Sequence, residues 1–245
     1  MDLRFSWIKK SALYIGKKRA VKLVRLHPYE MSLIHNHPNV FIQTKSLRNW
    51  VHIMPSGTPL FPGLGASVIY ADAFNILKSD LWGSVPLGRN SHWKKLLLEH
   101  ITHIYPSAKL LDRIQALDPG IGTDRIHGDA TMANMVSLEI KPHRFMARWI
   151  DPCWRPYLPA DRRVDVAKGM QSAWNFEGVV SLNQKPFFIP RLAEAIKTAS
   201  EMTSSDDEVI NTWLLVHIAR LLRYQTPRVL KLFTEVLVDY YGCKL

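Results

Sequence analysis

Three polar residues near the middle of the sequence have the types and spacing that metal-assisted chemistry requires. Asp129 is followed five positions later by Asn134, and Asp151 ends a second apolar stretch. Carboxylate and amide oxygens are ligands that suit Mg²⁺, which usually takes only one or two carboxylates beside water and phosphate. Phosphoryl transfer needs such oxygens, together with a carboxylate near the attacking hydroxyl and positive charge on the phosphates. The three residues therefore predict phosphoryl-transfer chemistry on two loops.

The segments that contain these residues resemble the motifs of a known family. His-Gly-Asp at 127–129, four residues and Asn134, and then Ile-Asp at 150–151 resemble the aminoglycoside phosphotransferase and choline kinase-like family. Residues 161–168 resemble the start of the helix that follows in this family, and the three motifs stand in the expected order. Gly128 occupies the position where protein kinases usually have arginine, which favours the branch that acts on small molecules.

The resemblance implies a role for each of these residues. Asp129 would be the catalytic base or would orient the acceptor hydroxyl, and Asn134 with Asp151 would bind Mg²⁺. His127 would contribute to the catalytic loop chiefly by supporting it, and Asp165 would hold the loop backbone by hydrogen bonds. The implied phosphoryl donor is ATP.

The first 60 residues contain candidate contacts for that nucleotide. Lys22 lies in a segment that resembles the strand carrying the ATP-phosphate lysine, and Glu30 on the following helix would be its ion-pair partner. Residues 51–57 resemble the strand and hinge against which adenine packs, which makes Met54 a candidate contact. The glycine-rich Gly-x-Gly-x-x-Gly pattern is absent, so Lys9-Lys10-Ser11 is the candidate substitute for phosphate contacts.

Hydrophobic periodicity predicts the elements that position these residues. Strand-like alternation predicts strands at 3–7, 12–15, 19–26, 40–44 and 50–54, and Pro28 predicts the start of a helix through Ile34. Beyond a loop at 55–59 the spacing becomes helical, at 67–77, 91–104, 108–117, 164–176, 190–202, 208–224 and 227–241. We therefore expect an α+β, two-lobed protein-kinase-like fold, with a β-rich nucleotide-binding lobe at 1–55 and a mainly helical catalytic lobe at 56–245.

Composition agrees with a globular enzyme that has anionic partners. The 245 residues are 47% hydrophobic and 22% charged, with a formal net charge of +11. No apolar run is long enough to span a membrane, and no export signal is visible at the start. The two cysteines fit a reducing compartment, so a cytoplasmic location is expected. The basic residues are scattered, which does not favour a nucleic-acid partner but does not exclude one.

Several readings remain open at this level. A sugar, a lipid precursor or an anionic metabolite is expected as the acceptor, because the positive charge disfavours a polycationic one. A protein Ser/Thr kinase is one alternative, and a catalytically inactive kinase-like binding module is another, motivated by the missing glycines. Asp129, Asn134 and Asp151 could also be turn or strand-end residues, and Lys22 and Glu30 ordinary surface residues.

Overall fold

The computed structural model describes most of the chain. The described residues are 4–8, 11–15, 19–23, 26–43, 45–47, 51–55, 58–59, 66–83, 92–118, 125–141, 144–176, 178–179 and 187–221. The predicted helix at 227–241 lies outside these residues. No helix in the described part is both long and apolar enough to cross a membrane.

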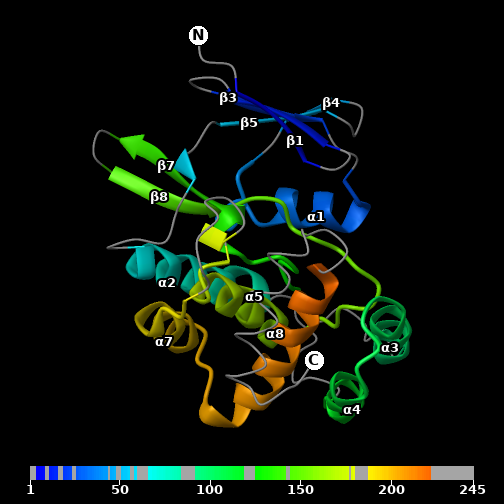
Figure 1. Cartoon of the computed structure of the whole chain (residues 1–245). Coiled ribbons are helices and arrows are strands. Elements are labelled where there is room, and N and C mark those ends of the chain that lie inside the picture. Colours follow the sequence, from blue (N-terminus) through cyan, green and yellow to red (C-terminus); the bar gives the residue numbers. More distant parts are fainter. Residues whose placement is uncertain are drawn as a thin grey trace.

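An antiparallel sheet forms the amino-terminal part of the molecule. Its strands run in the order β1-β2-β3-β5-β4, with bounds β1 Arg4–Ile8, β2 Ser11–Ile15, β3 Arg19–Leu23, β4 Lys45–Leu47 and β5 Val51–Pro55. The sheet lies at one end of the molecule, with helix α1 (Pro28–Asn36) beneath it and the remaining helices farther away (Figure 1). The predicted β-rich start and its helix are therefore confirmed.

The strand register brings three of the expected nucleotide contacts to one side of this sheet. Lys22 on β3 pairs with Leu13 on β2, and Ala20 on β3 pairs with Met54 on β5. Paired positions share a face, as do positions two apart on one strand. Positions 11, 22 and 54 are therefore on the same face of the sheet.

Helix α1 begins where the sequence predicts, because its first turn carries the signals of a helix start. Pro28 is at the first helical position, where the missing N–H removes nothing. The His27 ring accepts a hydrogen bond from the Tyr29 backbone N–H at 3.2 Å, and the Glu30 carboxylate accepts one from the His27 N–H at 2.7 Å. These reciprocal bonds form a capping box that fixes the helix start.

The strand predicted at 40–44 is wrong. Phe41 instead makes an isolated parallel bridge with Trp149. The Trp149 N–H donates to the Val40 carbonyl at 2.9 Å, and its own carbonyl accepts from the Ile42 N–H at 3.1 Å. The apolar run is therefore explained by burial against the end of a distant strand, because Val40 and Phe41 are both fully buried.

The rest of the described chain is mainly helical, with a second, three-stranded sheet of order β6-β7-β8. The strands are β6 Thr58–Pro59, β7 Met135–Lys141 and β8 Arg144–Trp149. The helices are α2 Ala66–Leu77, which continues into a π-helical turn at Lys78–Trp82, α3 Trp93–Ile104, α4 Ala108–Ala116, α5 Arg162–Ala173, α7 Pro190–Ala199 and α8 Asp207–Leu221. Short 3₁₀ turns occur at Met132–Asn134 and Ser204–Asp206. In Figure 1 the β7–β8 hairpin lies between the five-stranded sheet and the helices.

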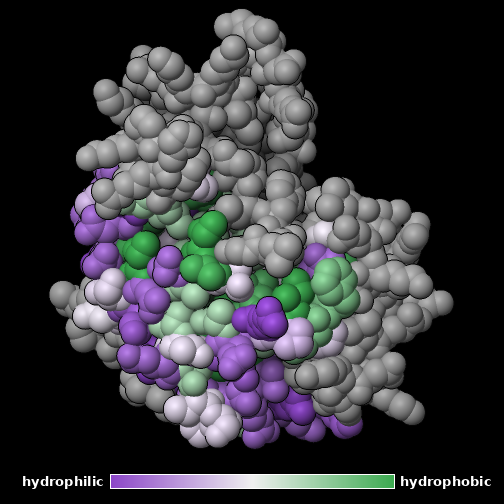
Figure 2. All heavy atoms as spheres, turned by 90° about the vertical axis from the view of Figure 1, so that its left-hand side faces the viewer, coloured by the Kyte–Doolittle hydropathy of each residue, from purple (hydrophilic) through white to green (hydrophobic). Residues whose placement is uncertain are grey.

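Helix α5 is at the centre of the helical part, and its residues 163–173 are all buried. Helices α2, α7 and α8 surround it (Figure 1). On the side that carries α2 and α7, apolar side chains gather in the middle of the described surface (Figure 2). A helix enclosed in this way needs no polar face, so its buried polar side chains, such as Asp165 and Lys168, require partners inside the molecule, and both have them.

Close packing of α5 against its neighbours leads to a first prediction. A Cβ at Gly169 would lie 2.7 Å from Cζ of Phe74 and 3.2 Å from Cγ2 of Ile196. Both side chains are fully buried, so neither can move away freely. We expect Gly169→Ala to lower the free energy of unfolding by about 1–3 kcal/mol, as overpacking does. Urea denaturation followed by circular dichroism measures this.

Gly83 provides the matched control. It follows the π-helical turn, it is exposed, and a Cβ there would meet nothing closer than 3.9 Å. Gly83→Ala should therefore leave the urea midpoint unchanged to within about 0.5 kcal/mol of stability. Equal midpoints for the two variants would contradict the packing argument.

Candidate active site

The two loops that carry the predicted site residues lie against each other. The Ile150 N–H donates to the Asn134 carbonyl at 2.8 Å, and the Cys153 N–H donates to the His127 carbonyl at 2.7 Å. One loop precedes strand β7 and the other follows strand β8. Because these two strands are antiparallel, they bring the two loops side by side. The structure therefore brings together the loops of Asp129, Asn134 and Asp151, which the sequence separates by up to 22 positions.

His127 is buried and supports the loop that carries Asp129. Its ring lies 5.1 Å from the ring of Trp149 and 5.5 Å from that of Phe41. Burial lowers the pKa of His127 to about 4, so the ring is neutral at pH 7. In this form Nε2–H donates to the Ile150 carbonyl at 3.0 Å, and Nδ1 accepts from the Asp129 N–H at 3.3 Å. The structure therefore favours the supporting role expected for His127.

Gly128 is required by the backbone at its position. Its φ of +77° is a conformation that side-chain-bearing residues rarely adopt. A Cβ there would lie 2.0 Å from the Cys153 carbonyl oxygen, far inside van der Waals contact. The carbonyl cannot easily retreat, because the Cys153 N–H is bonded to the same loop. An arginine, as in protein kinases, therefore does not fit this loop in its present form.

Asp165, on α5, accepts hydrogen bonds from the backbone of the loop that carries Asp129. Its Oδ2 accepts from the His127 N–H at 2.8 Å and from the Trp82 indole at 3.0 Å, and its Oδ1 accepts from the Gly128 N–H at 2.7 Å. Burial raises the pKa of Asp165 to about 6, even though the three hydrogen bonds act to lower it. The expected hydrogen bonds between the loop backbone and the Asp165 carboxylate are therefore confirmed.

Asp129 is held from two sides. Asn134 Nδ2 donates to the Asp129 Oδ2 and to its backbone carbonyl, at 2.8 Å each, and Lys168 Nζ lies 3.0 Å from Oδ1. Burial acts to raise the pKa of Asp129, but the charge and hydrogen bond of Lys168 outweigh it, and the pKa falls below its ordinary value. The carboxylate is therefore ionised at neutral pH, and its side chain keeps 36% exposure.

Lys168 is a site residue that sequence reasoning missed. In the sequence it is the last residue of the motif at 161–168, and nothing in that motif assigns it a role. Its side chain is 7% exposed, and its ammonium also donates to Gln171 Oε1 at 3.2 Å. The three-residue spacing of Asp165 and Lys168 could have indicated this role. Residues three apart on a helix share a face, and Asp165 was already expected to face the loop.

Asn134 and Asp151 fit a Mg²⁺ ion. The Asn134 amide nitrogen is turned to Asp129, which leaves its Oδ1 as the end that can meet a cation. Asp151 has φ +55°, a strained conformation that is more common at functional sites than elsewhere. The described residues hold no group of three His, Cys, Asp or Glu side chains able to bind a metal. One carboxylate and one amide oxygen nevertheless suffice for an ion whose other ligands are phosphate and water.

Glu30 connects α1 to the loop after Asp151. Besides the His27 N–H, its carboxylate accepts the Trp154 N–H at 3.0 Å. The rings of His27 and Trp154 stack with their centres 4.0 Å apart and 3° between their planes. The side chains of Lys22, Ser11 and Met54 lie outside the described part, so the ion pair of Lys22 with Glu30 stays a prediction.

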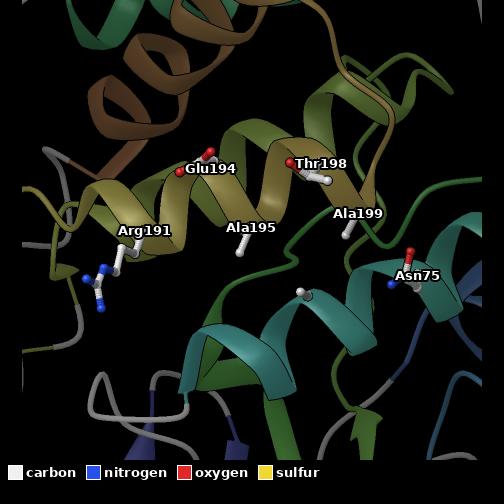
Figure 3. Close-up of a pocket in the computed structure, with 7 residues that line it drawn as sticks. Asn75, Arg191, Glu194, Ala195, Thr198 and Ala199 are labelled. Carbon is white, nitrogen blue, oxygen red and sulfur yellow. The ribbon is translucent and has the colours of Figure 1, made fainter.

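A hollow of about 490 Å³ lies away from these loops, between α2 and α7 (Figure 3). Its lining consists of Ala71, Asn75, Arg191, Glu194, Ala195, Thr198 and Ala199. None of these residues was predicted to act in the site, and none of the predicted site residues lines it. It is therefore separate from the candidate active site.

The Asp165 bonds generate the second prediction. In Asp165→Asn the amide NH₂ must face at least one of the donors that the carboxylate now accepts, and that donor remains buried without a partner. One unsatisfied buried N–H costs about 1–3 kcal/mol, which urea denaturation should register as lost stability. Asp112→Asn, on the exposed face of α4, should change the urea midpoint little. A similar midpoint shift in both variants would contradict the role of Asp165.

The third prediction concerns the pH dependence of stability. The pKa of His127 is about 4 in the folded protein and about 6.5 when exposed, so the unfolded chain binds the proton first. Its contribution is complete above pH 6.5 and is lost as the pH falls towards 4. Relative to His127→Gln, the wild-type protein should lose up to about 1.4 kcal/mol per pH unit in this range.

The raised pKa of Asp165 acts in the opposite direction. Its contribution is complete below the ordinary pKa of 3.8 and is lost as the pH rises through about 6. Both proteins contain Asp165, so the difference between wild type and His127→Gln isolates the histidine. Urea denaturation at half-unit steps from pH 4.5 to 7.5 measures it, and a pH-independent difference would contradict the neutral, buried ring.

The chain resembles solved structures, whereas no protein-family model and no curated protein matches its sequence. A glucosamine kinase in complex with glucosamine, ADP and phosphate superimposes with a TM-score of 0.61 at 16% identity, over 98% of this chain and 80% of that one. A putative fructosamine-3-kinase from Thermobifida fusca gives 0.54 at 14% identity, over 97% and 91%. An aminoglycoside phosphotransferase in a ternary complex with streptomycin and ATP gives 0.53 at 12% identity, over 98% and 91%. The chain therefore has the α+β, two-lobed protein-kinase-like fold of these small-molecule kinases.

Proposed function

We propose that this protein is an ATP- and Mg²⁺-dependent phosphotransferase that phosphorylates a hydroxyl group of a small-molecule acceptor. The observation that carries the proposal is the ionised Asp129 carboxylate, fixed between Asn134 and Lys168 at the meeting point of the two loops. Phosphoryl transfer depends on positioning and electrostatics more than on covalent chemistry by the protein, and this arrangement supplies both.

Asp129 would receive the acceptor hydroxyl. Each carboxylate oxygen already accepts one donor, from Asn134 or Lys168, and each retains a further lone pair. A hydroxyl that donates to this carboxylate is aligned for attack. Its proton would pass to Asp129 as its oxygen bonds to the γ-phosphorus of ATP and the bond from that phosphorus to ADP breaks, so that ADP leaves. The lowered pKa makes Asp129 a weak base, so orientation of the hydroxyl is its larger contribution.

Asn134 and Asp151 would hold Mg²⁺, which offsets negative charge on the phosphates when bound. The bond between the Ile150 N–H and the Asn134 carbonyl keeps the two ligand-bearing segments adjacent. Lys22, Ser11 and Met54 would bind ATP from the sheet, where their positions share a face. Glu30, on α1, would assist ATP binding as the ion-pair partner of Lys22. The nucleotide-binding lobe would then be residues 1–55 and the catalytic lobe residues 56–245.

Two observations favour a small-molecule acceptor over a protein. The structural neighbours are kinases whose descriptions name glucosamine, fructosamine or an aminoglycoside. The loop at Gly128 also has no room for the arginine that protein kinases carry there. The protein Ser/Thr kinase alternative is therefore the less favoured one.

The fourth prediction tests the roles of the two aspartates separately. Asp129→Asn should reduce turnover about 10²–10⁴-fold, the usual contribution of a positioned acid–base group, while Mg²⁺–ATP binding persists. Asp151→Asn should instead lose the Mg²⁺-dependent part of ATP affinity. Hydrolysis of ATP by water, which needs no known acceptor, gives the turnover, and calorimetry with and without Mg²⁺ gives the affinity.

Glu208→Gln, on the exposed first turn of α8, is the matched charge-removing control and should match the wild type in both measurements. Near-normal turnover in Asp129→Asn would sink the catalytic assignment. Absence of Mg²⁺–ATP binding by the wild-type protein would favour an inactive kinase-like module instead.

A further inference from the structure

Basic side chains gather on the side of Asp129 that faces α8 and the segment 151–160. Lys168 forms its ion pair with Asp129, and Arg220, in the last turn of α8, is near enough to help lower the pKa of that carboxyl. Arg155 also interacts electrostatically with Asp129. Three cations therefore act on the Asp129 carboxylate, and Lys168 is in direct contact with it.

The contacts described for Arg220 are to uncharged rings. Its guanidinium carbon lies 5.0 Å from the centre of the Tyr157 ring, and Nη1 donates to His217 Nδ1 at 3.2 Å. Burial lowers the pKa of His217 well below its ordinary value, so this ring is neutral, and Nε2–H donates to the Val164 carbonyl. Among the residues that the structure describes, no carboxylate forms an ion pair with Arg220.

Arg155 is similar but more exposed. Its Nη1 donates to the neutral carbonyl of Trp154 at 2.7 Å. The nearby Glu30 carboxylate, which accepts two backbone N–H groups, helps to raise the pKa of Arg155. The Tyr157 ring, over which the Arg220 guanidinium lies, stacks in turn on the His100 ring, with the ring centres 4.5 Å apart. We call Lys168, Arg155 and Arg220 the cationic wall of the site, and the Tyr157 ring lies beneath the Arg220 charge.

We propose that this wall binds a carboxylate or phosphate group of the acceptor, so that the substrate is an anionic, hydroxyl-bearing molecule such as a sugar acid or a sugar phosphate. A guanidinium offers parallel N–H donors that match either oxyanion, and such charge-assisted pairs are stronger than neutral hydrogen bonds. A cationic amine placed here would meet Lys168, Arg155 and Arg220, and like charges at close range exclude the wrong partner. This inference rests on the proposed function and specifies its acceptor.

The test compares four sugars of similar size and different charge. D-glucose 6-phosphate and D-glucuronate carry the two oxyanions, D-glucose is neutral, and D-glucosamine is cationic. Binding is measured by calorimetry at constant ionic strength, with and without saturating Mg²⁺–ADP. We expect at least one anionic sugar to bind about tenfold or more tightly than glucose, and glucosamine to bind more weakly than glucose; the two anions separate carboxylate from phosphate recognition.

Two variants locate the effect. Arg220→Met should remove the preference for the anionic sugar over glucose, and Arg155→Met, at an exposed position, should reduce that preference with no demand on folding. Arg191→Met, an exposed arginine on α7 and away from the loops, is the matched control and should behave as the wild type.

Two results would overturn the inference. One is glucosamine binding as tightly as the anions; the other is a wild-type protein that binds Mg²⁺–ADP but binds neither anion better than glucose. Failure of the proposed function is seen separately, as absence of Mg²⁺–ADP binding. The anion series without nucleotide still gives a result in that case, because the cationic wall belongs to the helical part of the chain.

Discussion

The candidate site depends on one buried carboxylate and the backbone it holds. Asp165 accepts the N–H groups of His127 and Gly128, two consecutive residues of a loop that has no regular structure of its own. A loop with left-handed backbone at Gly128 would otherwise expose unpaired donors inside the molecule, which is costly. With these donors satisfied, the loop backbone at Asp129 is fixed, and Asn134 of the same loop and Lys168 of α5 can hold its carboxylate.

Helix α5 is therefore more than part of the core. It carries Asp165 and, three residues later, Lys168, so one face of one helix fixes both the backbone and the carboxylate of the catalytic loop. Its burial by α2, α7 and α8 makes this face rigid, and α8 extends the site by carrying Arg220. The packing of α5 against its neighbouring helices thus determines where the charged groups of Lys168 and Arg220 lie.

The local parts of this arrangement could be predicted from sequence, and the parts that depend on packing could not. The residue types and spacing of Asp129, Asn134 and Asp151 are visible in the sequence, where the first two precede β7 and the third follows β8, and Pro28 marks the start of α1. Lys168 and Arg220 were not found, since only the packing of α5 and α8 brings them to the loop. The strand expected at 40–44 is not formed. An apolar run does not show whether a segment pairs along a sheet or, as here, packs against Trp149 at the end of β8.

The bridge made by Glu30 has a consequence for how the two ends of the molecule communicate. One carboxylate accepts N–H groups from the start of α1 and from the segment after Asp151, and a stacked ring pair lies beside it. Movement of α1 relative to this segment must break both contacts, so the two positions are thermodynamically linked. A ligand that favours one arrangement of α1 then changes affinity at the Asp151 loop, and by reciprocity a ligand at that loop changes affinity beside α1 by the same factor.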